Sequence, residues 1–298
     1  MAPGAQRKTV LITGCSPGGI GHALCIAFHK RNWRVLATAR NTAALAELAA
    51  LGVETFLLEV NDAKSIEALV QSVTSVSNGK GLDMLINNAG VNYTVPALDI
   101  ELSGAKKVFD TNVFAVMAMC QAFAPLLIQA KGTIVQIAST ASEMPYVFGS
   151  VYNASKAALL SYSDTLRVEL APLDVKVISV ITGGVKSRLT QRFQRVLPEN
   201  SYYSDLDEQY QQRQKHSNTV GMEASKYAES VVAQIIPGAG PWPWKWIVKD
   251  ARKTWIWDGY GNGIIYWITG SWTWNTFFDW YFTRLFGLNR LRDKRKTV

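Results

Sequence analysis

Short apolar runs alternate with segments of helical spacing over the first 185 residues, and this alternation limits the folds that the chain can adopt. Strands that are separated by helices form βαβ units with right-handed crossovers and parallel pairing. Helices then cover both faces of the sheet. We therefore expect an α/β fold with a doubly wound parallel sheet. The expected strands are 9–13, 34–38, 53–58, 82–86, 133–138 and 175–181, and the expected helices are 20–30, 43–50, 62–76, 101–130 and 151–170.

The regular alternation ends near residue 186, and the composition changes from there to the C-terminus. Residues 186–220 are polar, rich in Gln, Arg and Tyr, and lack a clean period. A segment this long inside a compact domain is usually a lid or a binding loop, so we expect a substrate loop here. Residues 222–236 have helical spacing, and the breaker PGAGP comes next at 237–241. We therefore predict a first domain at 1–240 and an extension at 241–298.

Charge and aromatic content differ between these two parts. The last 58 residues hold nine of the ten tryptophans and carry ten Lys or Arg against four Asp or Glu, whereas the other 240 residues carry 21 against 19. Because the first domain is nearly balanced in charge, we expect no nucleic-acid partner.

The three cysteines are too few and too scattered for a disulfide framework, and the N-terminus MAPGAQRK shows no secretory signal. No metal site is expected.

The segment TGCSPGGIG, residues 13–21, lies between the first expected strand and the first expected helix. Glycines let the backbone turn tightly and approach a pyrophosphate, and a helix N-terminus offers free N–H groups and a positive dipole end. A plain glycine turn is the alternative, but the position at the start of a βαβ series favours a Rossmann-type dinucleotide site. The residues expected to contact the cofactor here are Gly14, Ser16, Gly19, Ile20 and Gly21.

The residue after the second expected strand indicates which dinucleotide binds. An NAD site commonly places an Asp or Glu there to bind the ribose hydroxyls. This strand instead ends RVLATAR, and Arg40 could pair with a 2′-phosphate. We therefore expect the cofactor NADPH/NADP+, with Arg40 as the selecting residue. A solvated surface arginine is the alternative.

Three polar residues have the types and spacing that ketone reduction requires. Tyr152 and Lys156 are four apart, so they lie on one face of a helix, and Ser139 comes thirteen residues earlier, just past a strand. Reduction needs a proton at the carbonyl oxygen, and tyrosine has a pKa of about 10, which a nearby Lys156 cation would lower. Ser139 could hydrogen-bond the oxygen as charge develops. The alternative is a buried tyrosine satisfied by a neighbour.

Together with NNAG at 87–90 and Asn112, these motifs occur in order at the right separations, and the chain resembles the short-chain dehydrogenase/reductase family from about residue 8 to 185. The resemblance implies an NADP-dependent oxidoreductase acting on CH–OH/C=O groups. It also implies that Asn112 holds a water linking Lys156 to solvent, and that Lys156 binds the nicotinamide ribose. Without the resemblance, Asn112 would be a helix-interior residue with a local hydrogen bond. Cofactor contacts are further implied for Asn88, Ala89, Gly90, Tyr152, Lys156, Val185 and Ser187.

Three positions depart from the family pattern. Four residues separate Gly14 from Gly19, where the family more often has three. Glu59 stands where the family has an Asp that helps to hold adenine, which leaves Asp62 as a substitute candidate. Thr-Gly at 182–183 replaces the usual Pro-Gly. These departures concern cofactor contacts and not the reaction class.

Further stretches are similar to a narrower group, the fungal NADPH-dependent 1-acyldihydroxyacetone phosphate reductases. They are NNAGVNYTVPALD, KGTIVQIAS, FGSVYNASKAAL and ITGGV. This resemblance implies reduction of a ketone in lipid metabolism, at the cytosolic face of the endoplasmic reticulum or the lipid droplet; a cytoplasmic location is the alternative. Another possibility is a short-chain ketoreductase of a fungal secondary-metabolite pathway. A catalytically silent NADP-binding sensor or scaffold is a third, against which the intact Ser139, Tyr152 and Lys156 argue.

The expected substrate loop holds cations that could grip a phosphate. It also holds Glu199, Asp205, Asp207 and Glu208, so a solvated loop of mixed charge is an equal alternative. The cations are Lys186, Arg188, Arg192, Arg195, Arg213 and Lys215.

Residues 265–287 contain ten aromatic residues among 23. Asn275 or Thr276 could cap a short helix that ends at Gly287, and the basic end NRLRDKRK comes after it. No apolar run there approaches the 18 or so residues that a membrane span requires. Trp and Tyr beside Lys and Arg instead suit an in-plane helix on an anionic membrane surface. Folding back onto the first domain, and burial in a homo-oligomer interface, are the alternatives.

Overall fold

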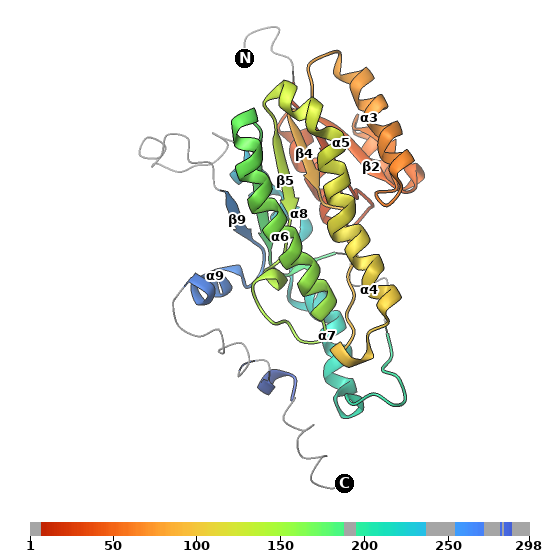
Figure 1. Cartoon of the computed structure of the whole chain (residues 1–298), viewed down its shortest axis with the longest axis vertical. Helices are drawn as coiled ribbons and strands as arrows, with labels where there is room; N and C mark the ends of the chain where they lie inside the picture. The colour runs from red at the N-terminus through yellow and green to blue at the C-terminus, as the bar shows by residue number, and fades with distance from the viewer. Residues whose placement is uncertain (1–6, 188–194, 237–253, 271–280, 282, 288–298) are drawn as a thin grey trace.

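The computed structural model describes residues 7–187, 195–236, 254–270, 281 and 283–287 (Figure 1). At its centre is a seven-stranded parallel sheet in the order β3-β2-β1-β4-β5-β6-β9. The chain moves outward from β1 to β3 and then restarts beside β1 with β4, so the strand order reverses between β1 and β4. The strands are β1 (Thr9–Ile12), β2 (Arg34–Ala39), β3 (Glu54–Leu57), β4 (Met84–Asn87), β5 (Thr133–Ile137), β6 (Lys176–Thr182) and β9 (Trp255–Asp258).

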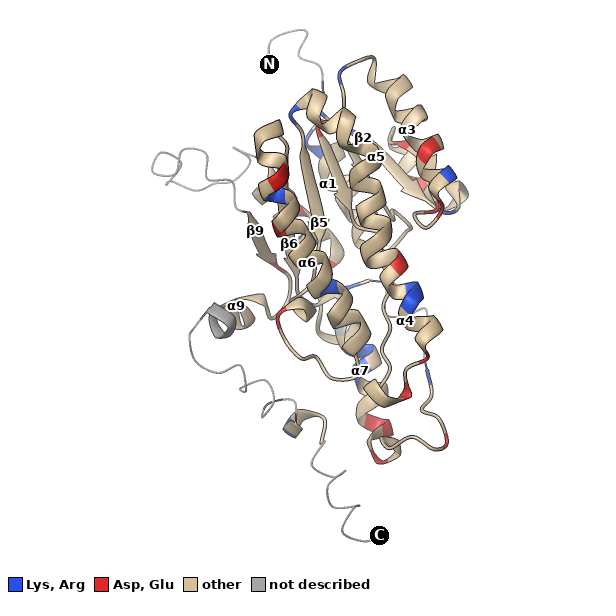
Figure 2. Cartoon of the chain, viewed as in Figure 1, with Lys and Arg blue, Asp and Glu red and all other residues tan. Residues whose placement is uncertain are grey.

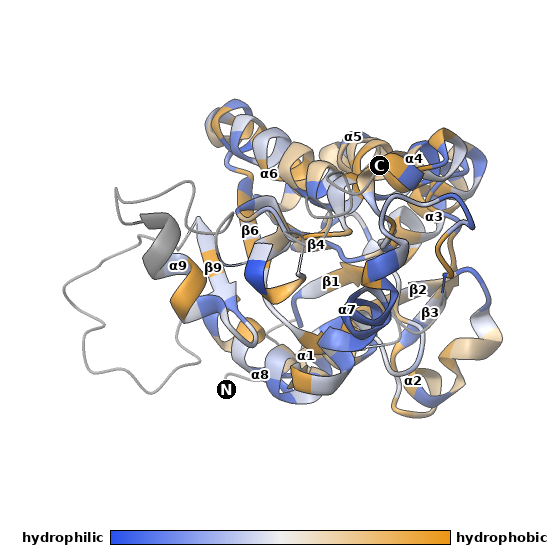
Figure 3. Ribbon diagram, turned by 90° about the horizontal axis from the view of Figure 1, so that it is seen from below, coloured by the Kyte–Doolittle hydropathy of each residue, from blue (hydrophilic) through white to orange (hydrophobic). Residues whose placement is uncertain are grey.

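Helices cover both faces of this sheet, as the view along the layers shows (Figure 3). Alternate strand residues face the two layers: Val10 and Ile12 pack with one helix set, and Leu11 packs with the other. Burial on both faces explains why the strands are continuous apolar runs, and the predicted doubly wound Rossmann-type sheet is confirmed. One layer holds α1 (Ile20–Lys30), α2 (Ala46–Ala50) and α8 (Ala224–Ile235); the other holds α3 (Ala63–Ser77), α5 (Ala115–Ala130) and α6 (Ser150–Leu170).

The predicted long helix 101–130 is interrupted by a π-helical turn. α4 (Leu102–Phe109) leads into the turn Asp110–Phe114, and α5 continues from it. Among the described residues, Leu102–Ala130 is the one helix whose length and composition would allow it to cross a membrane. Its Phe123 and Leu127 are fully buried against the sheet, so α5 is a packed core helix of this fold.

The second half of the predicted substrate loop is a helix, and the expectation of a loop over 186–220 is wrong there. α7 (Asp207–Val220) comes after the short turn Ser204–Leu206, and charges of both signs lie along this region (Figure 2). The residues that α7 buries include Arg213 and Gln214. Because these buried side chains are polar, no apolar stripe reveals the helical period. The middle of the predicted loop, 188–194, lies outside the described residues.

The last strand of the sheet comes from the segment that the sequence assigns to the extension. β9 pairs in parallel with β6, with Val180 opposite Ile256. Asp258, at the end of β9, accepts hydrogen bonds from Ser230 and Gln234 of α8. Residues 255–258 therefore belong to the central sheet, whereas the predicted boundary at 240 falls in 237–253, outside the described residues.

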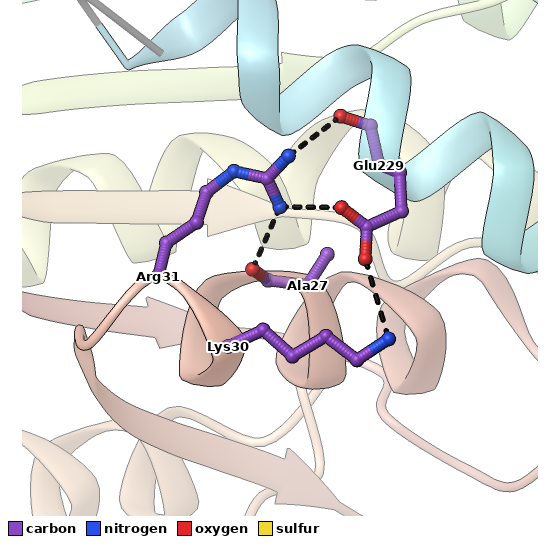
Figure 4. A network of polar contacts seen from close by, with 4 residues as sticks. All are labelled: Ala27, Lys30, Arg31 and Glu229. Carbon is purple, nitrogen blue, oxygen red and sulfur yellow. Dashed lines mark hydrogen bonds and ion pairs between the residues drawn. The ribbon is translucent and has the colours of Figure 1, made fainter.

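Ion pairs join the two helices of one layer (Figure 4). The Arg31 Nη1 atom lies 2.5 Å from Glu229 Oε2 and donates to the Ala27 carbonyl at 3.0 Å. The Arg31 Nη2 atom also donates to the Glu229 carbonyl at 3.3 Å, and Lys30 Nζ lies 3.5 Å from Glu229 Oε1. These contacts hold α8 against α1, the helix that begins at the glycine loop.

Described residues of the C-terminal extension, 241–298, contact the first domain at two places. The Trp255 indole N–H donates to Asp164 of α6 at 2.9 Å, and Phe286 is buried against Phe148, with ring centroids 5.5 Å apart. Gly287 has a φ of +64°, as a helix-ending glycine does. The proposed caps Asn275 and Thr276 lie outside the described residues. These contacts match the alternative in which the segment folds back onto the first domain.

Candidate active site

The loop after β1 packs tightly against the segment after β4, where the strand order reverses. The Thr13 hydroxyl accepts hydrogen bonds from the backbone N–H groups of Asn88 and Ala89, both at 3.0 Å. Gly14 has a φ of +72°, and a Cβ there would stand 2.9 Å from the Ala89 Cα. A Cβ at Gly21 would stand 2.5 Å from Nδ2 of the Asn88 side chain. The glycines are therefore required for this close packing, which leaves the loop backbone uncovered by side chains.

The start of α1 is open to an anion. Gly19 is the N-cap residue, so no side chain caps the helix, and the first turn contains no acidic residue. Ser16 contributes its carbonyl, which accepts from the Gly19 N–H at 3.2 Å. The next N–H groups along the chain, beginning at Ile20, have the orientation and dipole end that bind phosphate. All five glycine-loop residues predicted to contact the cofactor lie at this helix start.

Arg40 comes directly after β2 and is exposed. Its guanidinium makes no hydrogen bond or ion pair with the residues that the structure describes, so it is free to bind a 2′-phosphate. Asp62 instead caps α3, since its carboxylate accepts from the Lys64 N–H at 3.0 Å. The predicted contact of Asp62 with adenine stays a prediction.

A small cleft lies between the glycine loop and the π-helical turn. Its lining includes Thr13, Val60, Ala89 and Thr111, but not Asp62. Its accessible volume is about 10 Å³, room for about one water molecule, so this cleft is no site for a nucleotide ring.

Asn112 occupies the middle of the π-helical turn and is buried. Its Oδ1 accepts from the Val91 N–H at 2.9 Å, and its Nδ2 donates to the Val91 carbonyl at 3.0 Å and to the Ser155 hydroxyl at 3.1 Å. Asn112 therefore ties the segment after Gly90 to the helix residue next to Lys156. Single π turns within helices occur frequently at functional sites. The water that the resemblance places at Asn112 stays a prediction.

Ser139, Tyr152 and Lys156 come together where β5 ends and α6 begins. The Ser139 hydroxyl accepts from the Ala141 N–H at 3.1 Å. The Lys156 ammonium donates to the Ile137 carbonyl at 2.8 Å and lies 5.8 Å from the centre of the Tyr152 ring. The structure thus brings the three predicted catalytic side chains to one place, with Lys156 near Gly90.

Burial dominates the acidity of the Tyr152–Lys156 pair. It raises the pKa of Tyr152, while the Ser139 hydroxyl and the positive charge of Arg213 act in the opposite direction. Burial lowers the pKa of Lys156 to about 8. The expectation that Lys156 lowers the pKa of Tyr152 is not met, because removing the phenolate from water outweighs the attraction of nearby groups. The cation that opposes burial is Arg213.

Aromatic residues from distant parts of the chain pack next to this site. Phe148, Leu206, Tyr210 and Phe286 form a small core below the start of α6. The Tyr210 hydroxyl donates to the Thr94 carbonyl at 2.9 Å, which fixes α7 to the segment after β4. This arrangement places α7 as one wall of the substrate side of the site.

The cations of the predicted substrate loop have different surroundings. Lys186 pairs with Glu223 at 2.7 Å, Arg195 stacks on Tyr93 at 4.2 Å, and Lys215 is exposed. Arg213 is buried. Arg188 and Arg192 lie outside the described residues.

Val185 and Ser187 lie on the arm that leads from β6 to the substrate side. Val185 is buried in β7 (Val185–Lys186), which pairs with β8 (Met222–Glu223). The Ser187 N–H donates to Asn218 Oδ1 of α7 at 3.3 Å. The predicted contact of Val185 and Ser187 with the cofactor stays a prediction.

The residues present fit a nicotinamide dinucleotide. An uncapped helix N-terminus and a glycine loop with no room for a side chain at Gly14 or Gly21 come after β1, and a free Arg40 comes after β2. Lys156 lies near Gly90 of the segment after β4, since its Nζ is 3.9 Å from the place that a Cβ on Gly90 would take. The arrangement can hold a dinucleotide and deliver a proton to a group placed at its end.

Comparisons with known proteins agree with this geometry. The sequence model of the short chain dehydrogenase family matches residues 8–196. The short-chain dehydrogenase virD of Hypocrea virens is 40% identical over 97% of this chain and 96% of its own. The NADPH-dependent 1-acyldihydroxyacetone phosphate reductase of Schizosaccharomyces pombe is 41% identical over 85% of this chain and 86% of its own. A short chain dehydrogenase from Burkholderia cenocepacia, solved in complex with NADP, shares the fold with a TM-score of 0.68 at 21% identity, over 94% of this chain and 98% of its own.

Proposed function

The chain belongs to the short-chain dehydrogenase family and is an NADP-dependent oxidoreductase, and on that premise we propose that it reduces the ketone of 1-acyl-dihydroxyacetone phosphate. The observation that carries this choice of substrate is the 41% identity to a reductase of that name.

In the proposed reaction NADPH supplies the hydride, and the residues of this chain manage the carbonyl oxygen. The Tyr152 hydroxyl donates its proton to that oxygen as negative charge develops on it. The Ser139 hydroxyl donates a hydrogen bond to the same oxygen, which stabilises the charge in the transition state. The ammonium of Lys156, held by the Ile137 carbonyl at 2.8 Å and 5.8 Å from the centre of the tyrosine ring, favours the phenolate that proton donation leaves behind.

The test is NADPH oxidation by the purified full-length protein, with and without long-chain 1-acyl-dihydroxyacetone phosphate in mixed micelles. We expect turnover that disappears in Tyr152→Phe. Absence of turnover, from protein shown separately to bind NADPH, would contradict the proposed substrate and leave the oxidoreductase class in place.

A second candidate is a short-chain ketoreductase of a fungal secondary-metabolite pathway, acting on a ketone or quinone. The similarity to virD favours it, since that match extends over 290 residues and that to the acyl-dihydroxyacetone phosphate reductase over 260. A panel of neutral aromatic ketones and quinones in the same assay separates the two candidates.

We further propose that the C-terminal extension places the enzyme on a membrane surface, at the cytosolic face of the endoplasmic reticulum or the lipid droplet. Its composition supports this, with nine tryptophans and an excess of Lys and Arg. Several of its described apolar side chains are also exposed: Tyr260, Ile264, Tyr266, Tyr281 and Leu285. Deletion of 241–298 is an unsuitable test, because it would also remove β9 from the central sheet.

A further inference from the structure

Arg213 is a buried cation beside the catalytic tyrosine. It lies on the inner face of α7, in the same helix as Tyr210 and Gln214, and only 6% of its surface is exposed. Arginine is almost never fully buried unless it is paired. Yet its guanidinium forms no hydrogen bond or ion pair with any residue that the structure describes, and its buried Nε has no partner. The described part of the fold therefore holds a desolvated positive charge without an anion.

No acceptor of the described residues meets the N–H groups along the edge of the Arg213 guanidinium. One flat face is covered by the Tyr146 ring, whose centre lies 3.5 Å from the guanidinium carbon. Such stacking satisfies the face of the cation but uses none of its N–H donors. His216 also faces this group, and burial together with the charge of Arg213 lowers the pKa of His216, so the histidine adds no second cation at neutral pH.

Arg213 also lies close to the reacting group. Its Nη2 atom is 3.5 Å from the place that a Cβ on Gly149 would take, and Gly149 is the N-cap of α6, three residues before Tyr152. The charge of Arg213 is among the causes that act to lower the pKa of Tyr152. A ligand group on Arg213 would therefore belong to the same small molecule whose carbonyl is placed at Tyr152.

We propose that Arg213 binds the anionic group of the ketone substrate, a phosphate or a carboxylate, while Tyr152 and Ser139 engage its carbonyl oxygen. The inference rests on the proposed function, and it narrows the substrate class to ketones that carry an oxyanion near the carbonyl. A guanidinium presents its donors in a fork that matches two oxygens of such a group. Binding of the anion provides the charge partner that the buried Arg213 lacks among the described residues.

The test compares wild type with Arg213→Gln and Arg213→Lys on matched substrates. We expect KM for 1-acyl-dihydroxyacetone phosphate to rise roughly 10- to 100-fold in Arg213→Gln, with partial recovery in Arg213→Lys. The dephosphorylated ketone, 1-acyl-dihydroxyacetone, should show nearly the same KM in all three proteins. Lys226→Gln, which removes an exposed cation from the neighbouring α8, is the charge-matched control and should behave as wild type.

Two further measurements separate loss of the anion site from loss of folding. NADPH affinity, measured by fluorescence, should be the same in wild type and Arg213→Gln, which shows that the variant is folded and that the cofactor phosphates are not the ligand. Inorganic phosphate should inhibit the wild type competitively against the ketone substrate and should lose this effect in Arg213→Gln. Unchanged phosphate inhibition in an Arg213→Gln protein that still binds NADPH would overturn the inference.

The substrates also separate this inference from the proposed function. Arg213-dependent turnover of a keto acid, without turnover of 1-acyl-dihydroxyacetone phosphate, would support the anion site and reject the proposed lipid substrate. Equal KM values of wild type and Arg213→Gln for every phosphorylated and carboxylated ketone would overturn the anion site, even if the lipid substrate is reduced.

Discussion

At the scale of single residues, desolvation governs the chemistry of the site. Tyr152 keeps its proton because burial raises its pKa, so at neutral pH it is the acid that ketone reduction requires. Lys156 is buried with one carbonyl partner, and Arg213 with none among the described residues. Three titratable groups are thus held out of water within a short distance of one another, as is common at functional sites.

Removal of the Tyr152 hydroxyl should abolish proton donation without disturbing the cofactor site. We expect Tyr152→Phe to lower kcat by about 10²- to 10⁴-fold, the range typical of general acid catalysis. NADPH affinity should change much less, since Tyr152 is one of several predicted cofactor contacts and the glycine loop and Arg40 are left intact. Stopped-flow oxidation of NADPH measures the first quantity and fluorescence titration the second. An unchanged rate would show that another group supplies the proton.

The lowered pKa of Lys156 predicts how stability depends on pH. Its pKa is about 8 in the folded chain and near 10.5 when unfolded, so between these values the unfolded state binds more protons. Stability of the wild type should therefore rise with pH over this window, relative to Lys156→Met, by on the order of 2 kcal/mol. Urea unfolding of both proteins at about pH 7.5 and at about pH 10, two values that span most of this window, measures the difference in their free energies of unfolding. If wild type and Lys156→Met differ in free energy of unfolding by the same amount at both pH values, the lowered pKa of Lys156 is contradicted.

Arg40 should decide the preference for NADP over NAD. We expect Arg40→Asp to lower kcat/KM for NADPH by about 10- to 100-fold, because the 2′-phosphate loses its cation and meets a like charge. The same change should raise kcat/KM for NADH, since a carboxylate at this place can bind the ribose hydroxyls. Arg7→Asp, a change in an exposed arginine before β1, is the control. Parallel loss with both cofactors would indicate a structural role instead.

At the scale of elements, the connections around α7 and β9 shape the substrate side. α7 is held by the Tyr210 hydroxyl on the Thr94 carbonyl, and β9 is held to α8 through Asp258. These contacts join segments that lie far apart in sequence. They are hydrogen bonds between polar groups, so they produce no apolar repeat that could be recognised in the sequence. The glycine loop, the strands β1 to β6 and the helices α1, α3 and α6 were predictable because their signals are local.

Asp258 should be a strong anchor of the seventh strand. Its carboxylate accepts from Ser230, from Gln234 at 2.8 Å and from the Gly259 N–H at 2.8 Å, and it is buried. We expect Asp258→Ala to lower the free energy of unfolding by about 2–4 kcal/mol, because buried donors lose their partner. Glu223→Ala, which breaks the exposed pair with Lys186, should cost less than about 1 kcal/mol. Similar losses in the two variants, by urea unfolding, would reject this role.

At the scale of the whole molecule, the aromatic extension lies beside the catalytic domain and still exposes apolar side chains. Ile264 is 70% and Leu285 50% exposed, whereas Phe286 is buried. The extension therefore has an inner contact with the domain and an outer apolar surface. The outer surface is the part that the proposed membrane association requires.

Acidic substitutions on this outer surface should weaken membrane binding. We expect Ile264→Glu/Leu285→Glu to reduce co-sedimentation with anionic phospholipid vesicles at least several-fold, since acidic groups oppose both the apolar and the electrostatic contribution. Leu57→Glu is the matched control, because Leu57 is 61% exposed on β3 at the opposite edge of the sheet. If the wild type itself stays in the supernatant, the membrane proposal is wrong.

The sequence alone determined most of the elements, the dinucleotide loop and the identity of Ser139, Tyr152 and Lys156, because periodicity, glycine placement and motif spacing act over a few residues. It did not reveal that α7 is a helix, since two of its buried residues, Arg213 and Gln214, are polar, or that residues 255–258 complete the sheet. Only the tertiary structure showed that Arg213, one of six loop cations in the sequence, is buried beside Tyr152. Burial depends on contacts between residues that are distant in the chain, and desolvation then sets the charge and acidity of the site.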